Sequence, residues 1–424
     1  MENKSKGKAV ERIYALLDER SFVEIGQAVT ARSTDFQLDK VETPSDGVVT
    51  GYGLINGCPV YVYSQDAQVL GGSIGEMHAR KIVNLYDLAI KTGVPVIGMI
   101  DCAGIRLQES TDALHAFGMI YKKQAEASGV ILQISAIFGN CGGGLSVFTT
   151  LTDFTLMEEK GQLFVNAPNA IEGNRKEVLN SASAVFQSKE AGTVDFVGNE
   201  TEVFEEIRKL TQIFPSNYKD QSKVIDCVDD LNRLCENISA GNGKEILIQI
   251  ADQNEFLELK KDYGNDMAIG FIRLNGETIG CIANKEERIS AQGAKKAASF
   301  VKLCDAFGIG ILTVTDTVGF VAEIEQEKEL SQAIGAMTGA FVQATVPKVN
   351  VISKKAFGSA YVSMNSKSIG ADFVYAWSDA KIGMMEADMA VKIMYPGANA
   401  DVLKEKAKEY EELQSDVYTA ARRG

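Results

Sequence analysis

The first residues that could take part in chemistry are glycines in the segment GNCGGGLSVFTTLTDF, residues 139–154. Gly142 to Gly144 follow an apolar run and precede a predicted helix. A Walker-type phosphate loop is excluded, because Leu145 and Ser146 stand where that loop needs Lys followed by Ser or Thr. Two interpretations stay open: a tight strand-to-helix turn without chemistry, or backbone N–H groups aimed at an oxyanion.

Side chains for a nucleophile–base pair are scarce. The chain has two histidines, so a Ser–His or Cys–His pair must use His78 or His115 or be absent. We expect His78 to be a capped or solvent-edge residue of a helix, and His115 to have a similar role. The seven cysteines are scattered without Cys-x-x-Cys spacing, which indicates reduced cytosolic thiols rather than a zinc or redox site.

Composition narrows the class of protein. A chain of 424 residues, 45% of them hydrophobic, is long enough for two or three domains. Its net charge of -14, without a basic stripe, argues against nucleic acid as a partner. Residues 1–22 are charged and helical in pattern, and no apolar run approaches the length of a membrane span. We therefore expect a cytoplasmic protein that holds no metal.

The chain also repeats itself. Segments 20–27, 50–62, 78–104, 127–144 and 152–154 are similar, in the same order, to segments 254–261, 269–281, 293–319, 344–361 and 371–373. Colinear similarity of this kind predicts two homologous domains. We place them at residues 1–225 and 245–424, joined through the polar segment 216–244.

Each copy has the pattern of an α/β layer structure. Ser73 and Glu76 have the spacing of a capping box, and the helix that they begin ends near Gly93. The apolar run 94–100 then predicts a strand covered on both faces, so the alternation implies right-handed βαβ units. Ligands in such folds bind at the carboxyl ends of strands, where both small-residue runs fall.

Paired backbone loops with almost no histidine suit a reaction that passes through an enolate and takes its proton carrier from the ligand. Other polar residues have simpler interpretations. Asp101 and Asp316 are expected to be turn and cap residues at strand ends. The pairs Lys354-Lys355 and Arg80-Lys81 are candidates for contacts with coenzyme A phosphates.

The chain resembles the carboxyltransferase subunits of biotin-dependent acyl-CoA carboxylases and acyl-CoA decarboxylases, of the propionyl-CoA carboxylase beta-chain type. The segments that carry the resemblance are LLDERSFVEIG (16–26), SDGVVTGYGLINGCPVYVYSQD (45–66), GGSIGEMHARKI (71–82), ASGVILQISAIFGNCGGG (127–144), FVKLCDAFGIGILTVTDTVGF (300–320), ATVPKV (344–349) and AYVSMNSKSIGADFVYAW (360–377). The resemblance implies two crotonase-like domains in tandem, with acyl-CoA on the N-terminal side and biotin on the C-terminal side. It also implies a ring-shaped hexamer.

The resemblance further implies the residues of the site. The catalytic donors would be the amides of Gly143 and Gly144 for the thioester enolate, and those of Ser359 and Ala360 for the biotin ureido oxygen. Carboxybiotin would release CO₂ and accept the α-proton. The residues that would bind the coenzyme A thioester and biotin are Gly142, Gly358, Tyr361, Val362, Gly319 and Phe320. The implied partners are a biotin carboxyl carrier protein and either a biotin carboxylase or a membrane decarboxylase subunit.

Some positions depart from the family. Gly358-Ser359-Ala360 replaces Gly-Gly-Ala, which leaves a backbone donor but narrows the approach, and VGFVAE (318–323) replaces the usual Pro-Gly motif. Relatives continue past AARRG (420–424), as expected if this chain is a fragment.

Three functions stay open: carboxylation, decarboxylation and a non-catalytic role in binding coenzyme A. The apolar Val362 favours a short aliphatic acyl group. A hydratase or thioesterase is a weaker alternative, since no Glu stands beside the glycines.

Overall fold

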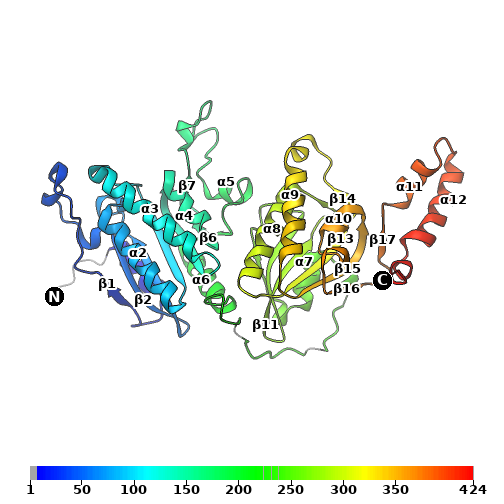
Figure 1. Cartoon of the computed structure of the whole chain (residues 1–424), viewed down its shortest axis with the longest axis horizontal. Helices are drawn as coiled ribbons and strands as arrows, with labels where there is room; N and C mark the ends of the chain where they lie inside the picture. Colours follow the sequence, from blue (N-terminus) through cyan, green and yellow to red (C-terminus); the bar gives the residue numbers. More distant parts are fainter. Residues whose placement is uncertain (1–6, 223, 231, 237, 424) are drawn as a thin grey trace. The chain divides into compact units, whose positions relative to one another are not determined.

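The computed structural model describes residues 7–222, 224–230, 232–236 and 238–423, and it divides into two compact units, Met1–Gln221 and Ser222–Gly424 (Figure 1). Residues 1–6 of the predicted N-terminal helix lie outside the described residues, and the rest of that segment forms α1 (Lys8–Leu16). Residues 223, 231 and 237 of the predicted polar connection and residue 424 also lie outside. Among the described helices, none has the length and apolarity to cross a bilayer.

The first unit is built on one mixed sheet, in the order β1-β2-β3-β4-β5-β6-β8, with β7 beside β5. Its strands are β1 (Val23–Ile25), β2 (Val48–Ile55), β3 (Cys58–Gln65), β4 (Val96–Cys102), β5 (Gln133–Gly142), β6 (Phe154–Glu158), β7 (Gln162–Phe164) and β8 (Phe196–Gly198). The first three strands are antiparallel, and from β3 onward neighbouring strands are parallel. The parallel part therefore ends its strands along one edge, as predicted for βαβ units.

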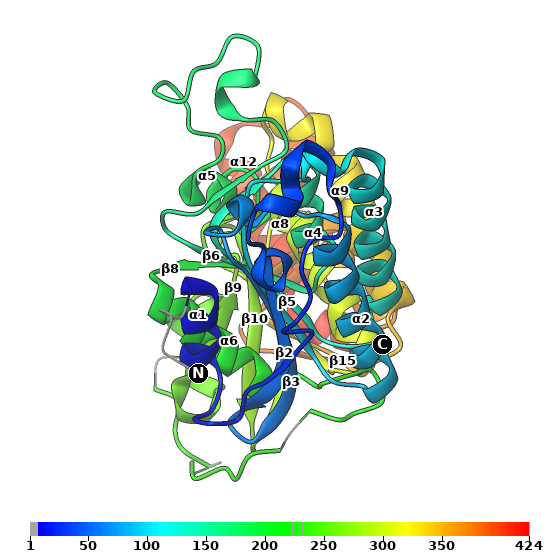
Figure 2. The same ribbon diagram turned by 90° about the vertical axis from the view of Figure 1, so that its left-hand side faces the viewer.

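Helices cover both faces of this sheet. Figure 2 shows α2 (Glu76–Thr92) and α3 (Ser110–Ala127) on one side of the strands and α1 with α6 (Glu200–Ile213) on the other. Two shorter helices complete the unit, α4 (Ser146–Thr150) and α5 (Ala184–Lys189). Fully buried Ile82, Leu85 and Ile120 face the sheet from α2 and α3. Their burial is the main force that holds these helices, at roughly 2 kcal/mol for each side chain.

The second unit has the same plan. Its sheet runs in the order β16-β15-β13-β11-β10-β9, with β17 beside β15. The strands are β9 (Phe256–Leu259), β10 (Met267–Leu274), β11 (Glu277–Asn284), β13 (Ile311–Thr317), β15 (Lys348–Phe357), β16 (Phe373–Ala376) and β17 (Lys381–Gly383), and a separate pair is β12 (Arg288–Ile289) with β14 (Gly319–Phe320). The helices are α7 (Gly243–Ile250), α8 (Ala291–Ala306), α9 (Ile324–Gln343), α10 (Gly358–Ser363), α11 (Ala387–Met394), α12 (Ala400–Tyr410) and α13 (Val417–Ala421).

Equivalent hydrogen bonds show the duplication at the level of single atoms. In the first unit, Lys81 Nζ donates to the carbonyls of Ser45 (3.1 Å) and Val48 (2.5 Å). In the second unit, Lys296 Nζ donates to the carbonyls of Lys260 (3.2 Å) and Tyr263 (2.5 Å). Each residue of the second set stands 215 positions after its counterpart.

The strand register corrects one detail of the predicted repeat. Val96 pairs with Gln133 in the first unit, and Ile311 pairs with Lys348 in the second, so the interval of 215 residues continues through β5 and β15. The predicted match of segments 127–144 and 344–361 has an interval of 217, which is two residues out of register. The interval is 215 both before the preceding helices, at Val96 and Ile311, and after them, at Gln133 and Lys348, so helix length does not cause the shift.

The predicted capping box at Ser73 and Glu76 is wrong. The N-cap of α2 is Gly75, and no side chain of the helix start caps it. Instead, the carboxylate of Glu109 accepts the N–H of Glu76 at 2.6 Å. The predicted helix end is confirmed, because α2 stops at Thr92 and Gly93 adopts the left-handed φ of +69°.

The two sheets differ at one end. In the first unit, Phe154 of β6 is 1% exposed and packs its ring at 5.3 Å from that of Phe214, just beyond α6. In the second unit, the counterpart of β6 is β16, which is the last strand in the sheet order, and its Phe373 and Tyr375 are each 59% exposed. Their two rings stack on one another at 6.3 Å. The described residues of the second unit therefore leave this face of β16 open.

Candidate functional site

The first loop, residues 142–145, joins β5 to α4 at the carboxyl end of the parallel strands. Gly143 adopts a left-handed φ of +64°, and a Cβ built on it would meet no atom within 4 Å. A Cβ on Gly142 would lie 2.4 Å from the Phe164 ring, so that position is closed. Gly144 is exposed. A Cβ on Gly144 would lie 3.1 Å from the Tyr121 hydroxyl and 3.2 Å from the Phe117 ring. The loop therefore presents bare backbone at both glycines, with open space beside Gly143.

The second loop, residues 357–360, occupies the equivalent place, where β15 ends at Phe357 and α10 begins at Gly358. Gly358 has a left-handed φ of +60°, and a Cβ on it would lie 3.0 Å from the carbonyl oxygen of Met384. Ser359 is exposed, whereas Ala360 is 1% exposed. The interval of 215 residues makes Gly358 the counterpart of Gly143, and Ser359 the counterpart of Gly144.

The other residues predicted around the second loop lie together. Gly319 and Phe320 form β14, which contacts α10, the helix that carries Tyr361 and Val362. Arg288 holds this short strand by donating from Nη1 to the Phe320 carbonyl at 3.2 Å. Val362 is 40% exposed, so an apolar side chain faces outward one turn from Ser359.

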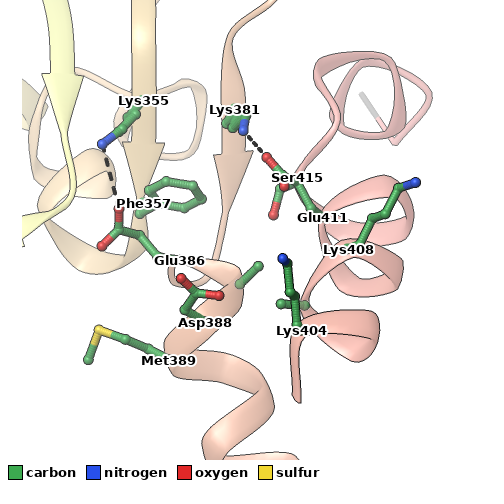
Figure 3. A pocket seen from close by; sticks show the side chains of 12 residues that line it. Lys355, Phe357, Lys381, Glu386, Asp388, Met389, Lys404, Lys408, Glu411 and Ser415 are labelled. Carbon is green, nitrogen blue, oxygen red and sulfur yellow. Dashed lines mark ion pairs between the residues drawn. The ribbon is translucent and has the colours of Figure 1, made fainter. Parts of the chain in front are cut away.

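A charged cavity of about 450 Å³ opens beside the second loop, between α11, α12 and the ends of β15 and β17 (Figure 3). Its walls include Phe357 of the loop and two ion pairs, Lys355 with Glu386 at 3.6 Å and Lys381 with Glu411. No local motif in the sequence marks this cavity, because its lining is spread from Lys355 to Ser415 over several strands and helices.

A buried ionic network supports the start of α2 in the first unit. Arg106, 1% exposed, donates to Asp46 at 2.6 Å and to Glu109 at 2.7 Å. His78 lies against this network, with Nε2 at 3.1 Å from the Gln65 amide nitrogen and Nδ1 at 3.0 Å from the Asp46 carbonyl. Desolvation, with the Arg106 charge, lowers the pKa of His78 to about 3. The imidazole is therefore neutral at physiological pH.

Of the two roles expected for His78, the solvent edge is wrong, because its side chain is fully buried. The capped role is confirmed, because the Asp46 carboxylate accepts its backbone N–H at 2.7 Å. His115 is exposed on α3. Neither histidine belongs to the first loop. Asp101 accepts from Arg12 Nη1 at 3.2 Å, and Asp316 accepts from the Lys355 N–H at 3.2 Å, so both carboxylates make structural contacts at strand ends.

The basic residues considered for contacts with coenzyme A phosphates differ in how exposed they are, and each has a partner within the chain. Lys81 is only 7% exposed, and its ammonium is occupied by two carbonyls, so it is not available to a phosphate. Burial lowers the pKa of Lys81 to about 8. Arg80 is exposed but pairs with Glu76 at 2.8 Å. Lys354 donates to the Ala240 carbonyl at 3.4 Å, and Lys355 pairs with Glu287 at 3.0 Å.

Comparison with known proteins extends over almost the whole chain. Residues 2–424 match the family of carboxyl transferase domains. The chain is 37% identical over 444 residues to methylmalonyl-CoA decarboxylase subunit alpha of Propionigenium modestum, covering 99% of this chain and 86% of that protein. It is 38% identical over 442 residues to the propionyl-CoA carboxylase beta chain of Cereibacter sphaeroides, covering 99% and 87%. The solved structure of transcarboxylase 12S, a hexamer with methylmalonyl-CoA bound, matches with a TM-score of 0.93 and 33% identity over 98% of this chain and 85% of that one.

Proposed function

The chain belongs to the family of carboxyl transferase domains, and on this premise we propose that it transfers a carboxyl group between biotin on a carrier protein and a short-chain acyl-CoA. The observation that carries the proposal is the pair of equivalent glycines, Gly143 and Gly358. Both adopt left-handed φ angles directly after equivalent central strands. Each unit therefore supplies one backbone loop of the same geometry, as a reaction with two carbonyl-like partners requires.

We assign acyl-CoA to the N-terminal domain predicted at residues 1–225, and biotin to the C-terminal domain predicted at residues 245–424. In the first loop, the N–H groups of Gly143 and Gly144 hold the thioester oxygen while negative charge develops on it. One such donor contributes about 3 kcal/mol to lowering the barrier. The open space beside Gly143 favours this role, since a carbonyl oxygen can approach the backbone there without meeting a side chain.

In the second loop, the strand register supports donors at Gly358 and Ser359, with Ala360 buried behind them. The proposed donors therefore lie one residue closer to the strand than the sequence-based pair, Ser359 and Ala360. The absence of a side chain at Gly358 fits a small ureido oxygen. When bound, carboxylated biotin supplies the carboxyl group as CO₂ and a nitrogen that accepts the α-proton. Tyr361, Gly319 and Phe320 surround this loop and are the residues that we assign to biotin.

The chain itself then needs no acid–base side chain at the first loop. His78 is buried and stays neutral, and His115 is exposed on a helix. We propose methylmalonyl-CoA and propionyl-CoA as the acyl pair, because the similar proteins act on or bind these thioesters by name. We also propose a hexamer that works with a biotin carrier protein in the cytoplasm.

The test is to incubate the purified protein with free biotin and, in turn, methylmalonyl-, malonyl- and glutaconyl-CoA. The expected result is biotin-dependent conversion of methylmalonyl-CoA to propionyl-CoA, which is measured by mass spectrometry. Supply of carboxybiotin with propionyl-CoA should drive the reverse carboxylation. If the protein binds coenzyme A thioesters but decarboxylates none of them, the non-catalytic role replaces this proposal.

A further inference from the structure

The peptide between Gly143 and Gly144 is held from one side by a single side chain. Ser146 Oγ donates to the Gly143 carbonyl at 2.7 Å, and the Ser146 N–H also points at that carbonyl. In a planar trans peptide, the N–H lies opposite to the C=O. By fixing the Gly143 carbonyl, Ser146 therefore fixes the direction of the Gly144 N–H, which is one of the assigned donors.

The next peptide is held by a second hydroxyl. Tyr121 of α3 donates from its phenol oxygen to the Gly144 carbonyl. The ring is fixed by Phe117 at 5.0 Å and by Phe148 at 5.6 Å between ring centroids. Burial raises the pKa of Tyr121, so the phenol keeps the proton that it donates. The two consecutive carbonyls of the first loop thus each accept a hydroxyl group.

The second loop is held differently. Helix α10 begins at Gly358 itself, whereas α4 begins only at Ser146, after a short 3₁₀ turn. The counterpart of Ser146 is Tyr361, which stands 215 positions later. The peptides that follow Gly358 therefore belong to α10, although Gly358 itself has a left-handed φ of +60°. The carbonyls of the first loop are held by the two hydroxyl groups in addition to the Ser146 N–H.

We propose that Ser146 and Tyr121 are positioning residues of the first loop. Ser146 fixes the peptide that carries the Gly144 N–H donor, and Tyr121 fixes the following peptide, Gly144–Leu145, so that Gly144 is held on both sides and its N–H stays aimed at the acyl-CoA thioester. This inference rests on the function proposed above. A displaced donor weakens the interaction made in the transition state more than it weakens the binding of the rest of coenzyme A. Loss of either hydroxyl therefore lowers kcat and leaves KM nearly unchanged.

The test compares Ser146→Ala, Tyr121→Phe and the rescue variant Ser146→Thr in the biotin-dependent decarboxylation of methylmalonyl-CoA. The matched control is Thr150→Val, which removes a hydroxyl-to-carbonyl bond of the same i−3 type, to Val147 at 3.0 Å, from the exposed side of α4. We expect kcat to fall about tenfold in the first two variants, with KM changed less than about twofold. The rescue variant Ser146→Thr is expected to keep most of the rate, since the threonine hydroxyl can reach the same carbonyl.

A second readout does not need turnover. Hydrogen–deuterium exchange of peptides that cover residues 139–150 should be several-fold faster in Ser146→Ala and Tyr121→Phe than in the wild type. Unchanged exchange in both variants overturns the inference. A wild-type protein without activity would count against the proposed function instead, and the exchange result would still decide the inference. A lower melting temperature with unchanged kcat also overturns it, because the hydroxyls would then serve stability alone.

Discussion

Gly143 allows the assigned oxyanion role to be separated from simple backbone strain. The first unit contains a matched glycine, Gly57, in the hairpin turn between β2 and β3. Gly143 has φ +64° and Gly57 has φ +77°, and a Cβ on either would meet no atom within 4 Å. Replacement of each by Ala therefore imposes the same kind of conformational cost, without a clash, at one site in the loop and one outside it.

The expected magnitudes differ between stability and rate. Holding Ala in a left-handed conformation costs about 1–2 kcal/mol, so both variants should lose a similar amount of unfolding free energy. The methyl group of Gly143→Ala also fills the space that the thioester oxygen must enter. Loss of one oxyanion donor lowers kcat by roughly 10²- to 10³-fold, and we expect Gly143→Ala to lose about 10²-fold. Gly57→Ala should keep a rate close to that of the wild type.

The assay is biotin-dependent decarboxylation of methylmalonyl-CoA by protein whose folding is checked by urea unfolding and whose assembly is checked by sedimentation. The two variants must be compared at matched fractions of folded, assembled protein. If Gly143→Ala and Gly57→Ala fold equally well and turn over at the same rate, the first loop is only a turn. The oxyanion assignment would then be refuted.

Four further predictions concern the histidines, the acid dependence of stability, a buried lysine and assembly. Replacing His78 and His115 together by Gln should leave turnover within about tenfold of the wild type, since neither is assigned to proton transfer; a loss beyond 10²-fold in folded protein would contradict this. The pKa of His78 falls from 6.5 to about 3 on folding, so between these pH values the unfolded chain binds a proton that the folded chain does not. Protonation of the unfolded chain therefore lowers the free energy of unfolding by up to about 5 kcal/mol as the pH drops through that window. Urea unfolding of His78→Gln should show a shallower acid dependence. Lys296→Met should cost about 2–4 kcal/mol in urea unfolding, because the carbonyls of Lys260 and Tyr263 lose their buried donor. Sedimentation at micromolar concentration should show an assembly in multiples of two, and a stable monomer would count against a shared site.

Much of the fold could be predicted from patterns in the sequence. The family and the tandem crotonase-like class are confirmed by the match over residues 2–424 and by the transcarboxylase structure. Both followed from the resemblance to the family, whose segments extend over nearly the whole chain. The internal repeat, spread over more than 100 residues per copy, predicted the two homologous α/β domains. Gly93 likewise ends its helix as expected, since a left-handed C-cap depends on one residue alone.

Contacts between distant segments could not be predicted in the same way. The start of α2 depends on Glu109, 33 residues beyond Glu76, and this partner replaces the local capping box. His78 and Lys81 are buried by Asp46, Ser45 and neighbouring carbonyls, which the helical periodicity of their own segment does not reveal. The two-residue register error has the same origin, because only the pairing of the strands shows which residues of β5 and β15 correspond.

The open end of the second sheet bears on how the protein behaves in concentrated solution. An edge strand with unpaired backbone groups can template pairing with the edge of another molecule, and two exposed rings on its face add apolar area to such a contact. Strand β16 ends the sheet order of the second unit, and Phe373 and Tyr375 are its two exposed rings. In the first unit, the matching Phe154 is buried. We therefore expect self-association of unassembled chains to begin at β16, and a charged residue in place of Tyr375 to raise their solubility.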